Sequence, residues 1–197
     1  MPPSKYARKS KCRIPKKFYI APEGTKTEYL YFDKLKRALR LENLEIITIP
    51  RPDNRTITDP NYIVTFATNY CKKNNIKPSD YIHVAIVIDF DRWGSKIPEA
   101  SKDALRRKYG FYVSNPCIEL WFILHDHPLT DAEKKSLKTC KNCKQLFNDL
   151  FSGNYNKLYP FTSIAINNSK QLTEGTESGW PKEIGTNINN LFSKIMK

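Results

Sequence analysis

The stretch that decides the fold is residues 84–91, with the sequence Val-Ala-Ile-Val-Ile-Asp-Phe-Asp. Five consecutive apolar residues, mostly β-branched, are typical of a strand that is buried on both faces in a parallel sheet. Asp89 and Asp91 follow where this strand ends, and open α/β sheets bind ligands at the carboxyl ends of their strands. Because side chains two apart on an extended backbone point to the same side, we expect the two carboxylates to converge on one cation. Taken alone, a solvated turn that merely ends the strand explains them equally well.

Strands and helices alternate on either side of this stretch. Further short strands are predicted at 18–21, 46–49 and 111–113, and helices at 28–41, 62–71 and 98–108. A fourth helix is predicted to start with Asn115 as its N-cap and Pro116 at its first position. Thr25 and Glu28 match a capping box for the first helix. This alternation predicts an α/β fold with a central parallel sheet of about four strands, flanked by helices.

The domain organisation follows from charge and periodicity. Residues 1–17 hold seven basic residues and no acid, and we expect them to form a flexible tail until they meet a partner. Residues 18–197 are predicted to form a single domain with a helical insertion or extension at 128–197. Within that extension, helices are expected at 134–151, 163–172 and 188–196.

The composition favours a polyanionic partner. The chain has 197 residues and a formal net charge of +13, from 33 Lys and Arg against 20 Asp and Glu. A basic tail on a basic body suits nucleic acid, DNA or RNA, although a solvated tail that aids solubility is the alternative. The apolar run at 18–21 is too short for a signal peptide, and no later stretch approaches a membrane span. Five scattered cysteines do not resemble a disulfide framework. We therefore expect a cytoplasmic protein that does not enter a membrane.

Acidic residues follow several of the predicted strands. Glu23 comes after the first strand, and Glu119 lies in the first turns of the fourth helix. In a parallel sheet these positions share one edge with Asp89 and Asp91, so the four acids are expected to surround one divalent cation, Mg²⁺ or Mn²⁺. Glu119 stands in an apolar helix and needs a cation or a proton, and a salt bridge is the structural alternative. Glu23 is also explained by a simple Pro-Glu-Gly turn.

Three motifs together resemble the RloB-like family. They are Glu23-Gly24-Thr25-Lys26-Thr27-Glu28 with Tyr31-Phe32, Asp89-Phe90-Asp91, and Ser114-Asn115-Pro116-Cys117-Ile118-Glu119-Leu120-Trp121 with His125. Ile118 stands where the family more often has an aromatic residue. The family comprises Toprim-domain proteins associated with abortive infection and phage defence, often encoded beside an ATPase partner. The resemblance implies a Toprim-like Rossmannoid domain in which Glu23, Asp89 and Asp91 form a Mg²⁺ site, with weaker matches at Lys170 and Thr186.

The function that we expect is a metal-dependent nuclease of Toprim type. Glu23 would be a ligand or the general base, Glu119 would complete the acidic group, and Glu28 and Lys170 are secondary candidates. Phosphate contacts are expected from Lys26, Arg92, Arg106, Arg107 and Lys108, and from the tail residues Lys5, Arg8, Lys9, Lys11 and Arg13. One alternative is a nucleic-acid-binding or regulatory subunit that is inactive without an ATPase partner, and another is a nucleotidyl-transfer enzyme.

The remaining motifs do not by themselves indicate a nucleotide-binding or metal-binding site. The chain has no Gly-x-x-x-x-Gly-Lys-Ser/Thr loop, so any ATP dependence would come from another chain. Cys140-x-x-Cys143 is half of a zinc site without a second pair, and His125 and His127 fit a polar helix exit as well as a metal. A homodimer is compatible with the sequence.

Overall fold

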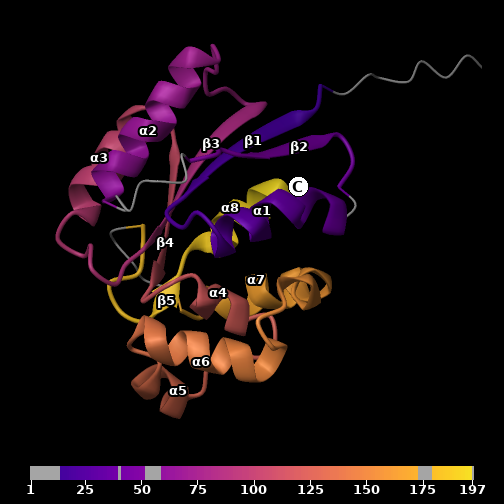
Figure 1. The fold of residues 1–197 in the computed structure, drawn as a ribbon, viewed down its shortest axis with the longest axis vertical. Helices are drawn as coiled ribbons and strands as arrows, with labels where there is room; N and C mark the ends of the chain where they lie inside the picture. The colour runs from indigo at the N-terminus through magenta and orange to yellow at the C-terminus, as the bar shows by residue number, and fades with distance from the viewer. Residues whose placement is uncertain (1–13, 40, 52–58, 173–178, 197) are drawn as a thin grey trace, which may run out of the picture.

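The computed structural model describes residues 14–39, 41–51, 59–172 and 179–196 (Figure 1). The predicted contacts from Lys5, Arg8, Lys9, Lys11 and Arg13 lie outside the described residues. Lys16 and Lys17, assigned above to the tail, are the first two residues of strand β1. None of the described helices is both long and apolar enough to cross a membrane.

Strands and helices alternate through the first half of the chain. They are β1 (Lys16–Pro22), α1 (Thr27–Ala38), β2 (Leu44–Thr48), α2 (Pro60–Lys73), β3 (Ile82–Asp89), α3 (Ile97–Arg106) and β4 (Gly110–Asn115). The second half contains α4 (Glu119–Ile123), α5 (Asp131–Ser136), α6 (Cys140–Phe151), two 3₁₀ turns (Tyr155–Lys157 and Tyr159–Phe161), α7 (Thr162–Lys170), β5 (Gly185–Thr186) and α8 (Ile188–Ile195).

The sheet has the strand order β2-β1-β3-β4-β5. The first four strands are parallel, and β5 pairs with β4 in the antiparallel sense. Each side chain of residues 84–88 in β3 is at most 2% exposed. Ala85 and Val87 join the core on one face of the sheet, while Val84, Ile86 and Ile88 join the core on the other. The prediction of a mostly parallel α/β sheet around a doubly buried strand is therefore confirmed.

Helices cover both faces of the sheet, as Figure 1 shows. Residues of α2 and α3 build the core on one face, and residues of α1, α4, α6, α7 and α8 build the core on the other. At the centre of the larger core, Trp121 Nε1 donates to Tyr31 Oη at 3.0 Å, and Tyr159 Oη donates to Tyr31 O at 2.9 Å. These bonds attach the C-terminal helices to the α/β core, because Tyr159 follows α6 and Tyr31 lies in α1.

Two predicted helix N-caps are wrong. The N-cap of α1 is Lys26, and no side chain caps this helix, so Thr25 and Glu28 do not form a capping box. Asn115 is the last residue of β4 rather than an N-cap: its Nδ2 donates to Lys182 O at 2.8 Å, and its peptide bond to Pro116 is cis. Helix α4 begins only at Glu119. For Asn115 a tertiary partner holds the side chain that the local rule had assigned to a cap, whereas the Glu28 carboxylate lies against the backbone at Gly24.

The C-terminal half of the chain differs from the sequence-based prediction in two places. The helix predicted at 134–151 is two helices, α5 and α6, and Thr139 caps the second by accepting from Asn142 N at 3.3 Å. The two-residue strand β5 was not predicted. The buried side chain of Asn187 extends this edge, since its Oδ1 accepts from Val113 N at 2.6 Å and its Nδ2 donates to Phe111 O at 3.4 Å.

Candidate acidic site

Strand pairing brings Glu23 next to Asp89. Pro22, the last residue of β1, pairs with Val87 of β3, and Glu23 N donates to Val87 O at 2.9 Å. Asp89 in turn pairs with Ser114 of β4. The carboxyl ends of three neighbouring strands therefore meet at one edge, as expected for a parallel sheet.

Glu23 is largely buried and its carboxylate is held on both oxygens. Its side chain is 9% exposed, Oε2 accepts from Asp89 N at 2.9 Å, and Oε1 accepts from Trp93 Nε1 at 3.1 Å. Arg51 donates to the Glu23 carbonyl oxygen. Burial raises the pKa of Glu23 to about 7, although these hydrogen bonds act in the opposite direction.

Glu28 turns inward toward the same edge. It lies in the first turn of α1, is buried, and packs its carboxylate against Gly24, where a Cβ atom would lie 1.7 Å from Glu28 Oε2. This close approach explains a glycine at position 24. Burial raises the pKa of Glu28, and the charge of Glu119 raises it further.

Asp89 and Glu119 complete a group of four carboxylates, Glu23, Glu28, Asp89 and Glu119, which we call the acid cluster. Asp89 Oδ1 accepts from Ile118 N at 2.9 Å. Burial raises the pKa of Asp89 well above its usual range, and the charges of Glu28, Glu23 and Glu119 raise it further. Glu119 is 6% exposed, and its Oε2 has no hydrogen-bond partner among the residues that the structure describes. The cluster therefore brings four carboxyl groups together, and the described residues supply hydrogen-bond donors to only some of their oxygens.

Asp91 lies at the rim of this cluster instead of inside it. Its side chain is 44% exposed and 3.8 Å from Arg92 Nε, and its backbone N–H donates to Pro116 O at 3.0 Å. Strand β3 ends at Asp89, so the two-residue alternation no longer governs where Asp91 points. Asp91 interacts with Cys140, the first residue of α6, so Asp91 lies between the acid cluster and the start of that helix.

Three thiols gather beside the acids. Cys117, which precedes α4, contacts both Cys140 and Cys143 at the start of α6. Contact with Cys117, followed by burial, raises the pKa of Cys140, so this thiol is protonated at neutral pH. The sequence analysis identified the Cys140–Cys143 pair but not its third member, because Cys117 is distant in the chain.

Lys144 is the cation that sequence reasoning missed. It lies in α6, and although partial burial acts to lower its pKa, the negative charge of Glu119 raises it. A spacing pattern would not have identified it, because Lys144 is one of two exposed lysines on α6 and its acidic partners are distant in the chain.

The other predicted basic residues are spread over two edges of the sheet. Lys26 is exposed at the start of α1, close in sequence to Glu23, and Arg92 is exposed beside Asp91. Arg106 and Arg107 pair with Asp103 at 3.2 and 3.0 Å, just before β4 begins, and Lys108 follows them at the opposite edge from the acids.

Three candidates outside the cluster have local partners. Lys170 ends α7 and donates to Asn167 Oδ1 at 3.2 Å. His125 is buried, its Nδ1 lies 2.9 Å from Trp121 O, and burial lowers its pKa to about 4. His127 contacts Asp126 and Glu133 at 2.8 and 2.7 Å.

The chemistry of these carboxylates suits a hard divalent cation, but their present positions do not form a coordination site. Carboxylate oxygens are the ligands that Mg²⁺ prefers, and the unpartnered Glu119 Oε2 shows an unmet demand for positive charge. Within the described part of the chain, however, no three His, Cys, Asp or Glu side chains are arranged to hold a metal ion. Glu23 and Asp89 already accept backbone or indole N–H groups, so ligation would require these side chains to reorient.

Comparison with known proteins identifies the family. Searches of the curated proteins and of the solved structures found no match. A family model described as RloB-like protein matches residues 18–195, from β1 to the last turn of α8. Because this match covers most of the 197 residues, the chain belongs to the RloB-like family.

Proposed function

We propose that this protein is a divalent-metal-dependent nuclease that hydrolyses phosphodiester bonds of DNA or RNA at the acid cluster. The observation that carries the proposal is the convergence of four carboxylates from separate segments at one sheet edge, with Glu119 Oε2 left without a partner. Holding like charges together destabilises the protein unless a cation offsets them. The chain has a net charge of +13, so a group of buried acids is unusual for its composition, and this charge fits a polyanionic substrate.

The roles follow from position and protonation. Asp89, Asp91 and Glu23 would hold Mg²⁺ or Mn²⁺, as a Toprim-type site uses a glutamate after the first strand and Asp-x-Asp after the third. When bound, the metal would activate water and offset charge on the phosphoryl group. Glu23 has a pKa of about 7, which also suits a general base near neutral pH. Glu119 and Lys144 would set the charge balance around the ligands.

Cleavage assays test this proposal directly. Purified protein is incubated with Mg²⁺ or Mn²⁺ and plasmid, single-stranded DNA, tRNA or rRNA. We expect Asp89→Asn combined with Asp91→Asn to slow cleavage by at least about 100-fold. Asp103→Asn is the matched control, because Asp103 pairs with Arg106 and Arg107 near the start of β4. Equal cleavage by the double variant and the unmutated protein would refute the assignment.

A second candidate is a subunit that binds nucleic acid but cleaves only with a partner, such as an ATPase. The favouring observation is that both Glu23 oxygens and one Asp89 oxygen are engaged by N–H groups, as in a site that must open before it binds metal. It predicts tight binding and no cleavage by the isolated chain, and robust turnover without a partner would exclude it. The role in phage defence implied by the family resemblance stays a prediction.

A further inference from the structure

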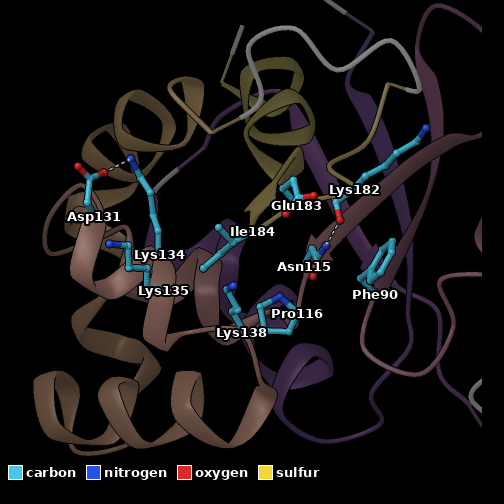
Figure 2. Close-up of a pocket in the computed structure, with 10 residues that line it drawn as sticks. All are labelled: Phe90, Asn115, Pro116, Asp131, Lys134, Lys135, Lys138, Lys182, Glu183 and Ile184. Carbon is cyan, nitrogen blue, oxygen red and sulfur yellow. Dashed lines mark hydrogen bonds and ion pairs between the residues drawn. The ribbon is translucent and has the colours of Figure 1, made fainter.

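A pocket lined by lysines lies beside the acid cluster and is not explained by the residues assigned above. Its volume is about 580 Å³, within the range of about 300–1,000 Å³ that ligand sites occupy. Lys134 and Lys135 of α5, with Lys138 in the segment after it, lie on one side, and Lys182 lies on the other. Figure 2 shows Phe90 and Lys182 across the pocket from α5, with the Lys138 amine pointing toward Ile184. We call this site the lysine pocket.

Its charge favours an anion. Lys134 pairs with Asp131 at 3.2 Å, whereas Lys135, Lys138 and Lys182 have no ion pair with any residue in the described ranges. The lining contains four lysines and two acids, Asp131 and Glu183. In Figure 2 the Lys138 amine points into the pocket, while the Lys134, Lys135 and Lys182 amines point outward around its rim, and phosphate groups bound there would offset this positive charge.

The pocket also has an apolar surface. Phe90, Pro116 and Ile184 contribute to its lining between the two basic sides. Single-stranded nucleic acid is bound in this way, because phosphates contact lysines while exposed bases pack on aromatic and apolar side chains. A duplex keeps its bases stacked inside, so it would leave this apolar surface without a partner.

The position relative to the acids is fixed by the backbone. Phe90 stands between Asp89 and Asp91, and Asp91 N donates to Pro116 O at 3.0 Å. On the other side, Lys138 is two residues before Cys140, the first residue of α6, which interacts with Asp91. A strand whose phosphates occupy the lysine pocket would therefore run directly to the rim of the acid cluster.

We propose that the lysine pocket binds the backbone phosphates of single-stranded nucleic acid and positions the strand next to Asp91. The proposal deepens the nuclease function and rests on it for cleavage, but binding itself requires no catalysis. Lys135 and Lys138 are positioning residues here, because they hold phosphates rather than the reacting atoms.

Binding is measured by fluorescence anisotropy on the full chain in EDTA, with labelled oligo-dT and oligo-U and a duplex of equal length. The test variant is Lys135→Gln with Lys138→Gln, both exposed, and the matched control is Lys72→Gln with Lys73→Gln, both exposed at the end of α2. We expect the test variant to lose about 10-fold or more in affinity for single strands. The slope of log K against log salt should fall by about 1.4, since each lost phosphate contact removes about 0.7. The control should bind like the unmutated protein.

Equal losses in the test and control variants would overturn the proposal, as would tighter binding of the duplex than of either single strand. The DNA and RNA arms decide which sugar the strand carries. Cleavage assays separate this inference from the nuclease function. Lysine-dependent binding without cleavage by any preparation would leave the pocket assignment standing while the nuclease proposal fails. Metal-dependent cleavage with an unchanged KM in the lysine variant would support the nuclease and refute the pocket.

Discussion

Ionisation of Glu23 should make folding stability depend on pH in the metal-free protein. The pKa of Glu23 rises from 4.5 to about 7 because burial penalises its charged form. In the unfolded chain this carboxyl ionises near its ordinary pKa, whereas in the folded chain it stays protonated until about pH 7. A raised folded-state pKa contributes stability that is fully present below the unfolded pKa and is lost as pH rises through the folded pKa. The stability from this group should therefore fall between about pH 4.5 and 7.

The magnitude follows from the pKa difference. Each pKa unit corresponds to about 1.4 kcal/mol, so ionising Glu23 should cost the folded state about 3 kcal/mol. Burial also raises the pKa of Asp89 and Glu28, which contributes in the same direction. Substituting Glu23→Gln removes the titration; its amide keeps one accepting oxygen and loses the other acceptor, a cost that is the same at both pH values.

Urea denaturation in EDTA buffers at pH 5 and pH 7.5 measures the effect. The unmutated protein should lose stability between the two, and Glu23→Gln should reduce that loss by about 2.5 kcal/mol, because pH 5 already lies above the unfolded-state pKa of 4.5. Glu42→Gln, at an exposed position before β2, is the control and should reproduce the unmutated pH dependence. An unmutated protein that gains stability on going to pH 7.5, or a Glu23→Gln variant with an unchanged loss, would refute the reasoning.

Two further substitutions test the local structure. Gly24→Ala places a Cβ atom against the Glu28 carboxylate, so we expect the free energy of unfolding in urea to fall by about 1–3 kcal/mol. Unchanged stability would show that Glu28 does not pack against this residue. Asn187→Ala removes the side chain that hydrogen-bonds Val113 N and Phe111 O. We expect the free energy of unfolding to fall by at least about 2 kcal/mol and the amide of Val113 to exchange faster. Unchanged exchange would contradict this arrangement of the sheet edge.

The sequence predicted those features that depend on local patterns. Apolar runs located β1 to β4, and the order of strands and helices placed Glu23, Asp89 and Glu119 at one edge of the sheet. These predictions succeeded because a doubly buried parallel strand needs a nearly continuous apolar run, as residues 84–88 show.

The remaining features depend on tertiary contacts. Glu28 matched a capping box, but its carboxylate lies against Gly24 and near Glu119, so it joins the acid cluster instead of capping α1. The outward position of Asp91 follows from the end of β3 at Asp89, and strand boundaries are the least certain part of a sequence prediction. Cys117, Lys144 and Asn187 contribute through partners distant in the chain, which no spacing rule identifies.

Calorimetric titration of the metal-free protein with Mn²⁺ at pH 7.5 tests the central claim most directly. If the acid cluster is a metal site, the unmutated protein should bind Mn²⁺ and release protons, because burial holds the pKa values of Asp89 and Glu23 high and the ligating carboxylates must ionise. The measured enthalpy should then change with the ionisation heat of the buffer, and Asp89→Asn should abolish binding while Asp103→Asn preserves it. Absence of Mn²⁺ binding by the unmutated protein, or equal binding by Asp89→Asn, would contradict the account.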